Sequence, residues 1–266
     1  MRKYWQIFKI SWQNALVYRF NFFMWQVRTL LSFLTIYFFW FAVLTQYDHI
    51  GTYSRTTMFA YLLVAAFLRN LVLWSDSYHA CVEIANGDLN NYLLKPLSYL
   101  GNWLARDWAD KILNLFFFVP ELALIIIVLK IPLVFPVSPW VWTWFILLAI
   151  LGSLLYFFFS FLVSSFSFWY PEHDGWPLRF FMLMFLDFLS GAAFPLDIFP
   201  QSVTAFFKLL PTSYFIYFPT QVYLGRLSFN DQLSGLIIML FWLIIFFWLV
   251  KIVWHKGLQI YGAYGR

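Results

Sequence analysis

Apolar stretches of membrane-spanning length recur along the chain and are separated by short polar segments. A helix needs about 20 apolar residues to cross roughly 30 Å of hydrocarbon. A further uncharged stretch, residues 209–225, is interrupted by Pro211 and Pro219, which favours a re-entrant or surface segment over a span. Six spans is therefore the favoured count, with five or seven as alternatives. The predicted transmembrane helices cover residues 22–44, 56–75, 112–130, 140–166, 178–196 and 232–252.

Two segments outside these spans also have helical patterns. In residues 1–21, polar side chains recur at helical spacing among aromatic ones, which predicts an amphipathic helix lying in the membrane interface. The alternative is a simple N-terminal extension of the first span. After the fifth span, residues 197–226 carry repeated prolines among aromatic side chains, which indicates two short helices in the outer leaflet.

The most polar part of the chain is the loop between the second and third spans. Gly87 suits the left-handed end of one helix, Asp88 suits the start of the next, and Pro96 stops that helix after two turns. The pattern predicts a short helix within residues 84–96 that presents Leu89, Tyr92 and Leu93 as an apolar face. Such a face implies a partner, or alternatively a segment folded back onto the membrane surface.

Composition excludes a soluble protein. Of the 266 residues, 63% are hydrophobic, 25% are aromatic and 11% are charged, and the mean hydropathy is +0.74. A soluble core of this size cannot hide so much apolar surface. Cytosolic enzymes, nucleic-acid binders and disordered linkers are therefore excluded, and the single Cys81 excludes a disulfide framework. The sequence predicts one all-α, polytopic membrane domain over residues 1–266.

Basic residues predict the orientation of this domain. If both termini are cytoplasmic, 11 of the 17 Lys and Arg residues fall on the inside. Four fall outside, namely Arg55, Lys130, Lys208 and Arg226. Because Lys and Arg concentrate in cytoplasmic segments, both termini are predicted to be cytoplasmic.

Four charged residues lie inside predicted spans: Arg28, Arg69, Glu121 and Asp187. Charges are costly in lipid, so we expect them to face a cavity or one another. Arg28 and Arg69 lie near span ends, where snorkelling to the interface is the alternative. For Asp187 and Glu121 the sequence leaves open whether the contact is a substrate or a structural partner.

No catalytic motif is present in the sequence. The chain lacks a phosphate-binding loop, a serine nucleophile elbow and a zinc-protease helix, so no catalytic residue and no metal site are expected. Glu172, His173 and Asp174 form the one tight acidic–histidine cluster, which is interpreted mainly as a solvated turn. They keep open the alternative of a membrane-embedded lipid-modifying enzyme. A second alternative is an ATP-independent channel or secondary carrier that uses Asp187 and Glu121.

The pattern resembles the permease subunits of type-2 ATP-binding-cassette (ABC) exporters. The segment from Gly87-Asp88-Leu89 to Lys95-Pro96-Leu97 is similar to a signature of the compact ABC-2 family transporter proteins, and residues 257–265 are similar to their closing motif. The resemblance implies a chain that pairs with a second permease and two ATP-binding subunits, which hold ATP and Mg²⁺. It also implies that the short helix contacts the ATP-binding subunit, through Glu83, Gly87, Asp88, Leu89, Tyr92, Leu93, Lys95 and Pro96.

The same resemblance implies a translocation path between two permeases, built chiefly from the first, second and fifth spans. An aromatic wall with an acid favours hydrophobic or amphipathic molecules, and cations over anions. The predicted setting is a bacterial cytoplasmic membrane, with lipids as neighbours and no nucleic acid. The candidate path residues are Arg28, Tyr37, Glu121, Phe181, Phe185, Asp187 and Phe188.

Overall fold

The computed structural model describes residues 2–17, 19–136, 138–171 and 176–262, and most of them are helical. The only strands in that part are β1 (His49–Ile50) and β2 (Tyr53–Ser54), which pair antiparallel as a small hairpin. Among the described residues, five segments are long and apolar enough to cross a membrane. They lie in α2 (Arg19–Gln46), in α3 (Arg55–Val72) with the short helices after it, and in α6 (Tyr99–Leu129), α7 (Pro139–Ser165) and α11 (Phe229–Ile260).

Serine residues define where four of these helices begin. Ser54, Ser98, Ser138 and Ser228 precede α3, α6, α7 and α11, and each side-chain oxygen accepts a hydrogen bond from a backbone N–H of the first turn. The distances are 3.3–3.4 Å. Because the first N–H groups of a helix lack partners within it, such a cap favours a helix start at that residue.

The fifth predicted span is shorter than expected. Its helix, α8 (Trp176–Leu189), has 14 residues and is about 21 Å long, so it does not reach across the hydrocarbon by itself. The chain turns at Gly191, whose φ of +82° ends the helix. The turn is held by Tyr61, whose hydroxyl donates to the Gly191 carbonyl at 2.6 Å, and by the Tyr217 amide, which donates to the Ser190 carbonyl at 2.9 Å. The second part of the expected span 178–196 is therefore a buried turn.

Short helices follow this turn, as the sequence predicts for residues 197–226. The two α-helices are α9 (Gln201–Leu209) and α10 (Tyr217–Tyr223), and the 3₁₀ turns η3 (Leu196–Ile198) and η4 (Pro211–Tyr214) precede them. In the core, α3 packs against α6, α7 and α10, and α7 also packs against α11. The buried centre of the molecule is therefore α3 with α7.

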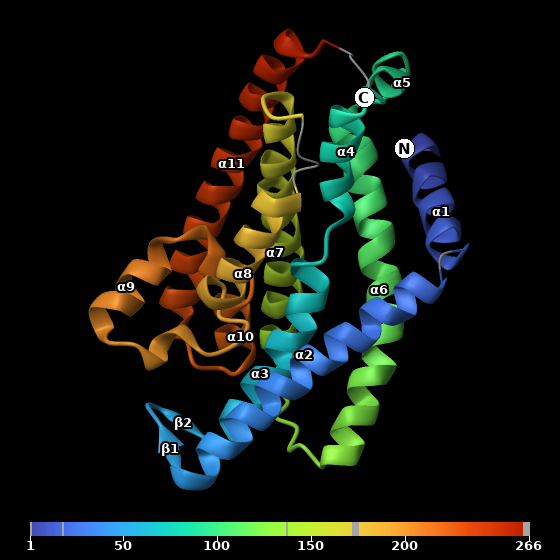
Figure 1. Ribbon diagram of the computed structural model, residues 1–266. Helices are drawn as coiled ribbons and strands as arrows, with labels where there is room; N and C mark the ends of the chain where they lie inside the picture. Colours follow the sequence, from blue (N-terminus) through green and yellow to red (C-terminus); the bar gives the residue numbers. More distant parts are fainter. Residues whose placement is uncertain (1, 18, 137, 172–175, 263–266) are drawn as a thin grey trace.

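The molecule has two distinct ends (Figure 1). The start of α1 (Arg2–Val17), α5 (Asn90–Leu93) and the end of α11 lie at one of them, which we name the α5 end. The β1–β2 hairpin lies at the other, the hairpin end. The helix α1 is separate from α2 and runs in a different direction. It packs along the first turns of α6, where Gly101 leaves room for the Tyr4 ring.

Candidate functional site

A cavity of about 360 Å³ lies in the α5 half of the molecule. Its walls come from the start of α2, the end of α3 with η1 (Asp76–Tyr78), the middle of α6 and the start of α8. Six charged residues line it, with equal numbers of each sign: Arg28, Arg69, Arg179, Asp76, Asp110 and Asp187. Aromatic and aliphatic side chains complete the wall, including Trp25, Trp74, Phe180, Leu183 and Met184.

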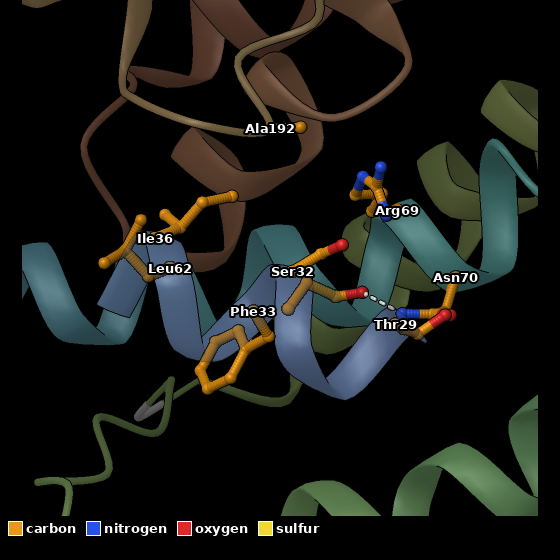
Figure 2. Close-up of a pocket in the computed structure, with 9 residues that line it drawn as sticks. Thr29, Ser32, Phe33, Ile36, Leu62, Arg69, Asn70 and Ala192 are labelled. Atoms are coloured by element: carbon orange, nitrogen blue, oxygen red, sulfur yellow. Dashed lines mark hydrogen bonds between the residues drawn. The ribbon is translucent and has the colours of Figure 1, made fainter. Parts of the chain in front are cut away.

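A smaller pocket of about 20 Å³ continues from this cavity toward the turn that holds Ala192 (Figure 2). The two spaces share Thr29, Ser32, Arg69 and Asn70. Figure 2 shows Ser32 and Phe33 from α2 beside residues of α3, and the Asn70 amide donates to the Ala66 carbonyl at 3.0 Å. The pocket has room for about one water molecule, so it does not extend the cavity for a larger guest.

Arg69 and Asp187 meet where the cavity narrows into that pocket. Arg69 Nε and Nη2 donate to the two carboxylate oxygens of Asp187 at 2.8 Å and 3.0 Å. The expectation that intramembrane charges face one another is therefore correct for this pair, and snorkelling of Arg69 is wrong. Each charge satisfies the other, and the ion pair links α3 to α8.

Two further arginines of the cavity have no carboxylate partner in the part of the chain that the structure describes. Arg28 forms no ion pair among the described residues and lies 4.8 Å from the Trp25 ring. Arg179 is buried and donates to the Ser160 hydroxyl at 2.9 Å and to the Ser75 carbonyl at 3.0 Å. Arg179 is therefore held by hydrogen bonds within the protein, whereas the Arg28 guanidinium is available to pair with a ligand.

A buried polar cluster supports the floor of the cavity. Lys111 and Asp107 are fully buried and pair at 2.5 Å, and the Ser75 hydroxyl donates to the second oxygen of Asp107. Asp107 and Lys111 fall between the predicted second and third spans, in the segment expected to be a polar loop, but both lie inside α6. Their spacing of four residues is the signal that indicates a pair on one helix face. Ser77 extends the cluster by donating to Ser160 at 2.8 Å.

The predicted path residues divide into two groups. Arg28 and Asp187 line the cavity. The others lie elsewhere: Tyr37 is buried in the core, and Glu121 is only partly buried and outside the cavity. Phe181, Phe185 and Phe188 are half-exposed and absent from the wall of this cavity, so the aromatic wall between two permeases stays a prediction. In their place, Phe180, Leu183 and Met184 of α8 line the cavity.

The predicted short helix is smaller than expected. A first helix, α4 (His79–Ala85), ends before Gly87, whose φ of +82° agrees with the predicted helix end. The next helix, α5, has one turn and ends at Leu93 before Pro96 is reached. Asp88 does not cap it with its side chain, because α5 starts at Asn90 and its first turn bonds to backbone carbonyls.

The residues of this tip segment (residues 86–97) separate into anchors and exposed positions. Leu89 is fully buried, so it is not part of an exposed face. The Tyr92 hydroxyl accepts from Arg106 at 2.9 Å, and Arg106 also donates to Glu83 at 3.2 Å. Leu93 and Leu94 are 47% and 88% exposed. The apolar surface offered at the α5 end is thus Leu93 with Leu94, held in position by Glu83 and Arg106.

Comparison with known proteins gives the family. A family model described as ABC-2 family transporter protein matches residues 30–265, nearly the whole chain. The chain therefore belongs to the ABC-2 family of transporter proteins, and it is a multi-pass membrane permease subunit of an ABC transporter. No curated protein and no solved structure matches it. Glu172, His173 and Asp174, on which the lipid-enzyme alternative depends, lie outside the described residues.

Proposed function

We propose that this chain is the membrane subunit of an exporter in a bacterial cytoplasmic membrane and moves amphipathic molecules out of the cell. Two copies, or this chain with a related permease, join two ATP-binding subunits that hold ATP and Mg²⁺. The observation that carries this proposal is the membership of the ABC-2 family combined with a tip segment that exposes Leu93 and Leu94. Exposed apolar side chains at a helix tip are typical of a protein contact.

The proposed orientation puts the α5 end in the cytoplasm. The start of α1, α5 and the end of α11 lie together at that end, and most of the Lys and Arg residues belong to segments on this side. The tip segment then faces the cytoplasm, where ATP-binding subunits reside. The cavity lies in the same half, so a substrate enters it from the cytoplasm or the inner leaflet.

Movement of the tip segment reaches the cavity through α6. Glu83 and Tyr92 both contact Arg106 of α6, and Asp110 of the cavity wall lies one helical turn further along. A displacement of α5 by the ATP-binding subunit therefore acts on α6 directly. This contact supplies a path by which ATP-driven motion changes the shape of the cavity.

The test is a substitution that damages the exposed contact alone. Leu93→Asp and Leu94→Asp place a charge in the proposed apolar contact, and we expect loss of the ATP-binding subunit on co-purification and loss of transport-coupled ATPase activity. Ile260→Asp is the matched control, because Ile260 is 51% exposed at the end of α11. Retention of the ATP-binding subunit and of full coupled ATPase activity by both leucine variants contradicts the proposed contact.

A further inference from the structure

The cavity offers its two charge signs on different walls. Arg69 and Asp187 neutralise each other, and Arg179 is held by Ser160 and by a backbone carbonyl. Arg28 on α2 remains on one side, and the carboxyls of Asp76 and Asp110 remain on the other, from η1 and α6. The cavity therefore presents Arg28, which is exposed and has no ion-pair partner among the described residues, together with a hydrogen-bonded pair of acids, Asp76 and Asp110.

The cationic wall suits an oxyanion. Arg28 lacks an ion-pair partner among the described residues, and its guanidinium lies 4.8 Å from the Trp25 ring, which orients it. A guanidinium has a planar set of donors that matches phosphate or carboxylate oxygens in pairs. This position is therefore built to receive an anionic group.

The acidic wall suits an ammonium group. The Asp110 carboxyl is hydrogen-bonded to that of Asp76, His79 lies 3.1 Å from Asp76, and Arg106 of α6 acts electrostatically on both acids. The Tyr78 ring borders the same wall, but the Arg179 guanidinium lies 4.9 Å from its centroid, so the attraction for a cation comes from the acids. A carboxylate attracts a quaternary or primary ammonium through its charge. A cation bound here leaves Arg28 uncompensated, and an anion bound at Arg28 leaves the acids uncompensated.

The third wall is apolar. Phe180, Leu183 and Met184 of α8 line it, and Trp74 also lines the cavity. A volume of about 360 Å³ is within the range of small-ligand sites. An alkyl chain against α8 would bury its apolar surface there while its headgroup reaches both charged walls.

We propose that the cavity binds a zwitterionic amphiphile, with its anionic group on Arg28, its ammonium on Asp76 and Asp110, and its alkyl tail along α8. This inference rests on the proposed function, because it treats the cavity as the substrate site. A net-neutral headgroup with both signs satisfies both walls at once, whereas a ligand with a single charge leaves one wall desolvated and unpaired.

The test compares three amphiphiles that share one tail. The full chain in non-ionic maltoside micelles is titrated with dodecylphosphocholine, dodecyl phosphate and dodecyltrimethylammonium, and binding is measured by calorimetry as a mole fraction in the micelle. We expect the zwitterion to bind about tenfold more tightly than either singly charged amphiphile. Equal or tighter binding of either singly charged amphiphile overturns the proposal.

Substitutions on each charged wall test how much that wall contributes to the preference for the zwitterion. Arg28→Gln should remove the advantage over dodecyltrimethylammonium, and Asp110→Asn should remove the advantage over dodecyl phosphate. Arg55→Gln is the matched control, because Arg55 lies outside the cavity beside Phe41 and should leave the preference unchanged. If Asp110→Asn fails to fold, as judged by its melting temperature, Asp76→Asn replaces it. A preference unaffected by both wall variants overturns the proposal.

One further titration distinguishes the kind of anionic group that is bound. A comparison with the coupling experiment then distinguishes this proposal from the exporter function. Dodecyl betaine replaces phosphate by carboxylate: equal binding supports zwitterions in general, and binding of the phosphocholine alone supports a phospholipid headgroup. Because this titration needs neither ATP nor the ATP-binding subunit, it is independent of the coupling experiment. Loss of coupling without loss of zwitterion preference would contradict the exporter function alone.

Discussion

The two halves of the molecule use similar residues in opposite ways. In the hairpin half, Tyr53, Asp197, Gln221 and Arg226 form a closed network. The Tyr53 hydroxyl donates to Asp197 at 2.8 Å and accepts from Gln221 at 2.5 Å, and Arg226 lies 3.8 Å from the Tyr53 ring. In the α5 half, six charged residues line a cavity of about 360 Å³, and Arg28 among them has no acidic partner within the described residues.

The difference indicates which half is built to stay closed. Burial, reinforced by Asp197, raises the pKa of the Tyr53 phenol above its usual range, so Tyr53 stays a neutral donor. Tyr53, Asp197 and Gln221 bond to one another, and Arg226 lies beside Asp197, so the charges of this network are paired within the protein. The α5 half keeps Arg28, an exposed arginine without an ion-pair partner among the described residues, on the wall of an open cavity, so a ligand that enters can reach its charge. The hairpin half thus holds its charged groups in contacts within the protein, whereas the α5 half holds a cavity that a ligand can occupy.

The largest expected effect concerns which half faces which side of the membrane. In a Cys81→Ser background, Asn90→Cys in α5 should react with an impermeant thiol reagent only from the cytoplasm. Ser202→Cys in α9 should react only from outside. The measurement is labelling of intact cells against inverted vesicles. Reversed or two-sided labelling at either position would break the proposed orientation of both halves.

The next effect concerns the turn after α8. Gly191 has a φ of +82°, and an added Cβ would lie 2.7 Å from the Tyr61 hydroxyl and 2.8 Å from the Tyr217 Cβ. Gly191→Val should therefore lower the free energy of unfolding by about 3 kcal/mol or more, seen as a reduced melting temperature in detergent.

Gly225→Val is the control for this prediction. Gly225 has a similar φ of +66°, but nothing lies within 4 Å of its added Cβ. Only the backbone strain is common to the two variants, so the Gly225 variant should lose about 1–2 kcal/mol. Equal losses at the two positions would show that the close packing of the turn contributes nothing.

A smaller effect is expected within the hairpin-half network. Tyr53→Phe removes one hydroxyl that serves Asp197 and Gln221, and should cost about 1–3 kcal/mol because buried polar groups lose their partner. Tyr47→Phe, at a position 61% exposed, should cost almost nothing. Thermal unfolding of the two variants checks this, and a stable Tyr53→Phe protein would mean that the network does not hold the hairpin end closed.

The smallest effect concerns the ion pair at the narrow end of the cavity. The Arg69 and Asp187 side chains are 31% and 37% exposed, so solvent weakens their attraction, and Asp187→Asn or Arg69→Gln alone should cost about 1 kcal/mol. In a double-mutant cycle the paired variant should cost less than the sum of the single ones. Strict additivity in unfolding experiments would mean that the pair contributes no coupling between α3 and α8.

Hydropathy by itself was enough to predict the class of fold and the approximate positions of most spans. α7, for example, begins at Pro139 because a proline-rich, uncharged loop precedes it and Ser138 caps it, and both signals are local. The helix end at Gly87 is local as well. The resemblance carried by the segment after Gly87 agrees with the family match over residues 30–265.

The length of α8 and the rotation of each helix depended on the tertiary structure. A hydropathy window sums apolar character, but it contains no information on the turn that Tyr61 and Tyr217 hold at Gly191. Nor does it indicate which face of α8 meets α3, so Phe180 and Phe181 were indistinguishable although only Phe180 lines the cavity.

The pairing of charged side chains also depended on the tertiary structure. The sequence determined that Arg28, Arg69 and Asp187 needed compensation, because an isolated charge in a membrane is costly. Only the tertiary structure decided that Arg69 of α3 would meet Asp187 of α8, and that Arg28 would have no ion-pair partner among the described residues. The physical reason is range: the cost of a charge acts at its own position, whereas its relief requires a second group within a few ångströms, brought there by the fold.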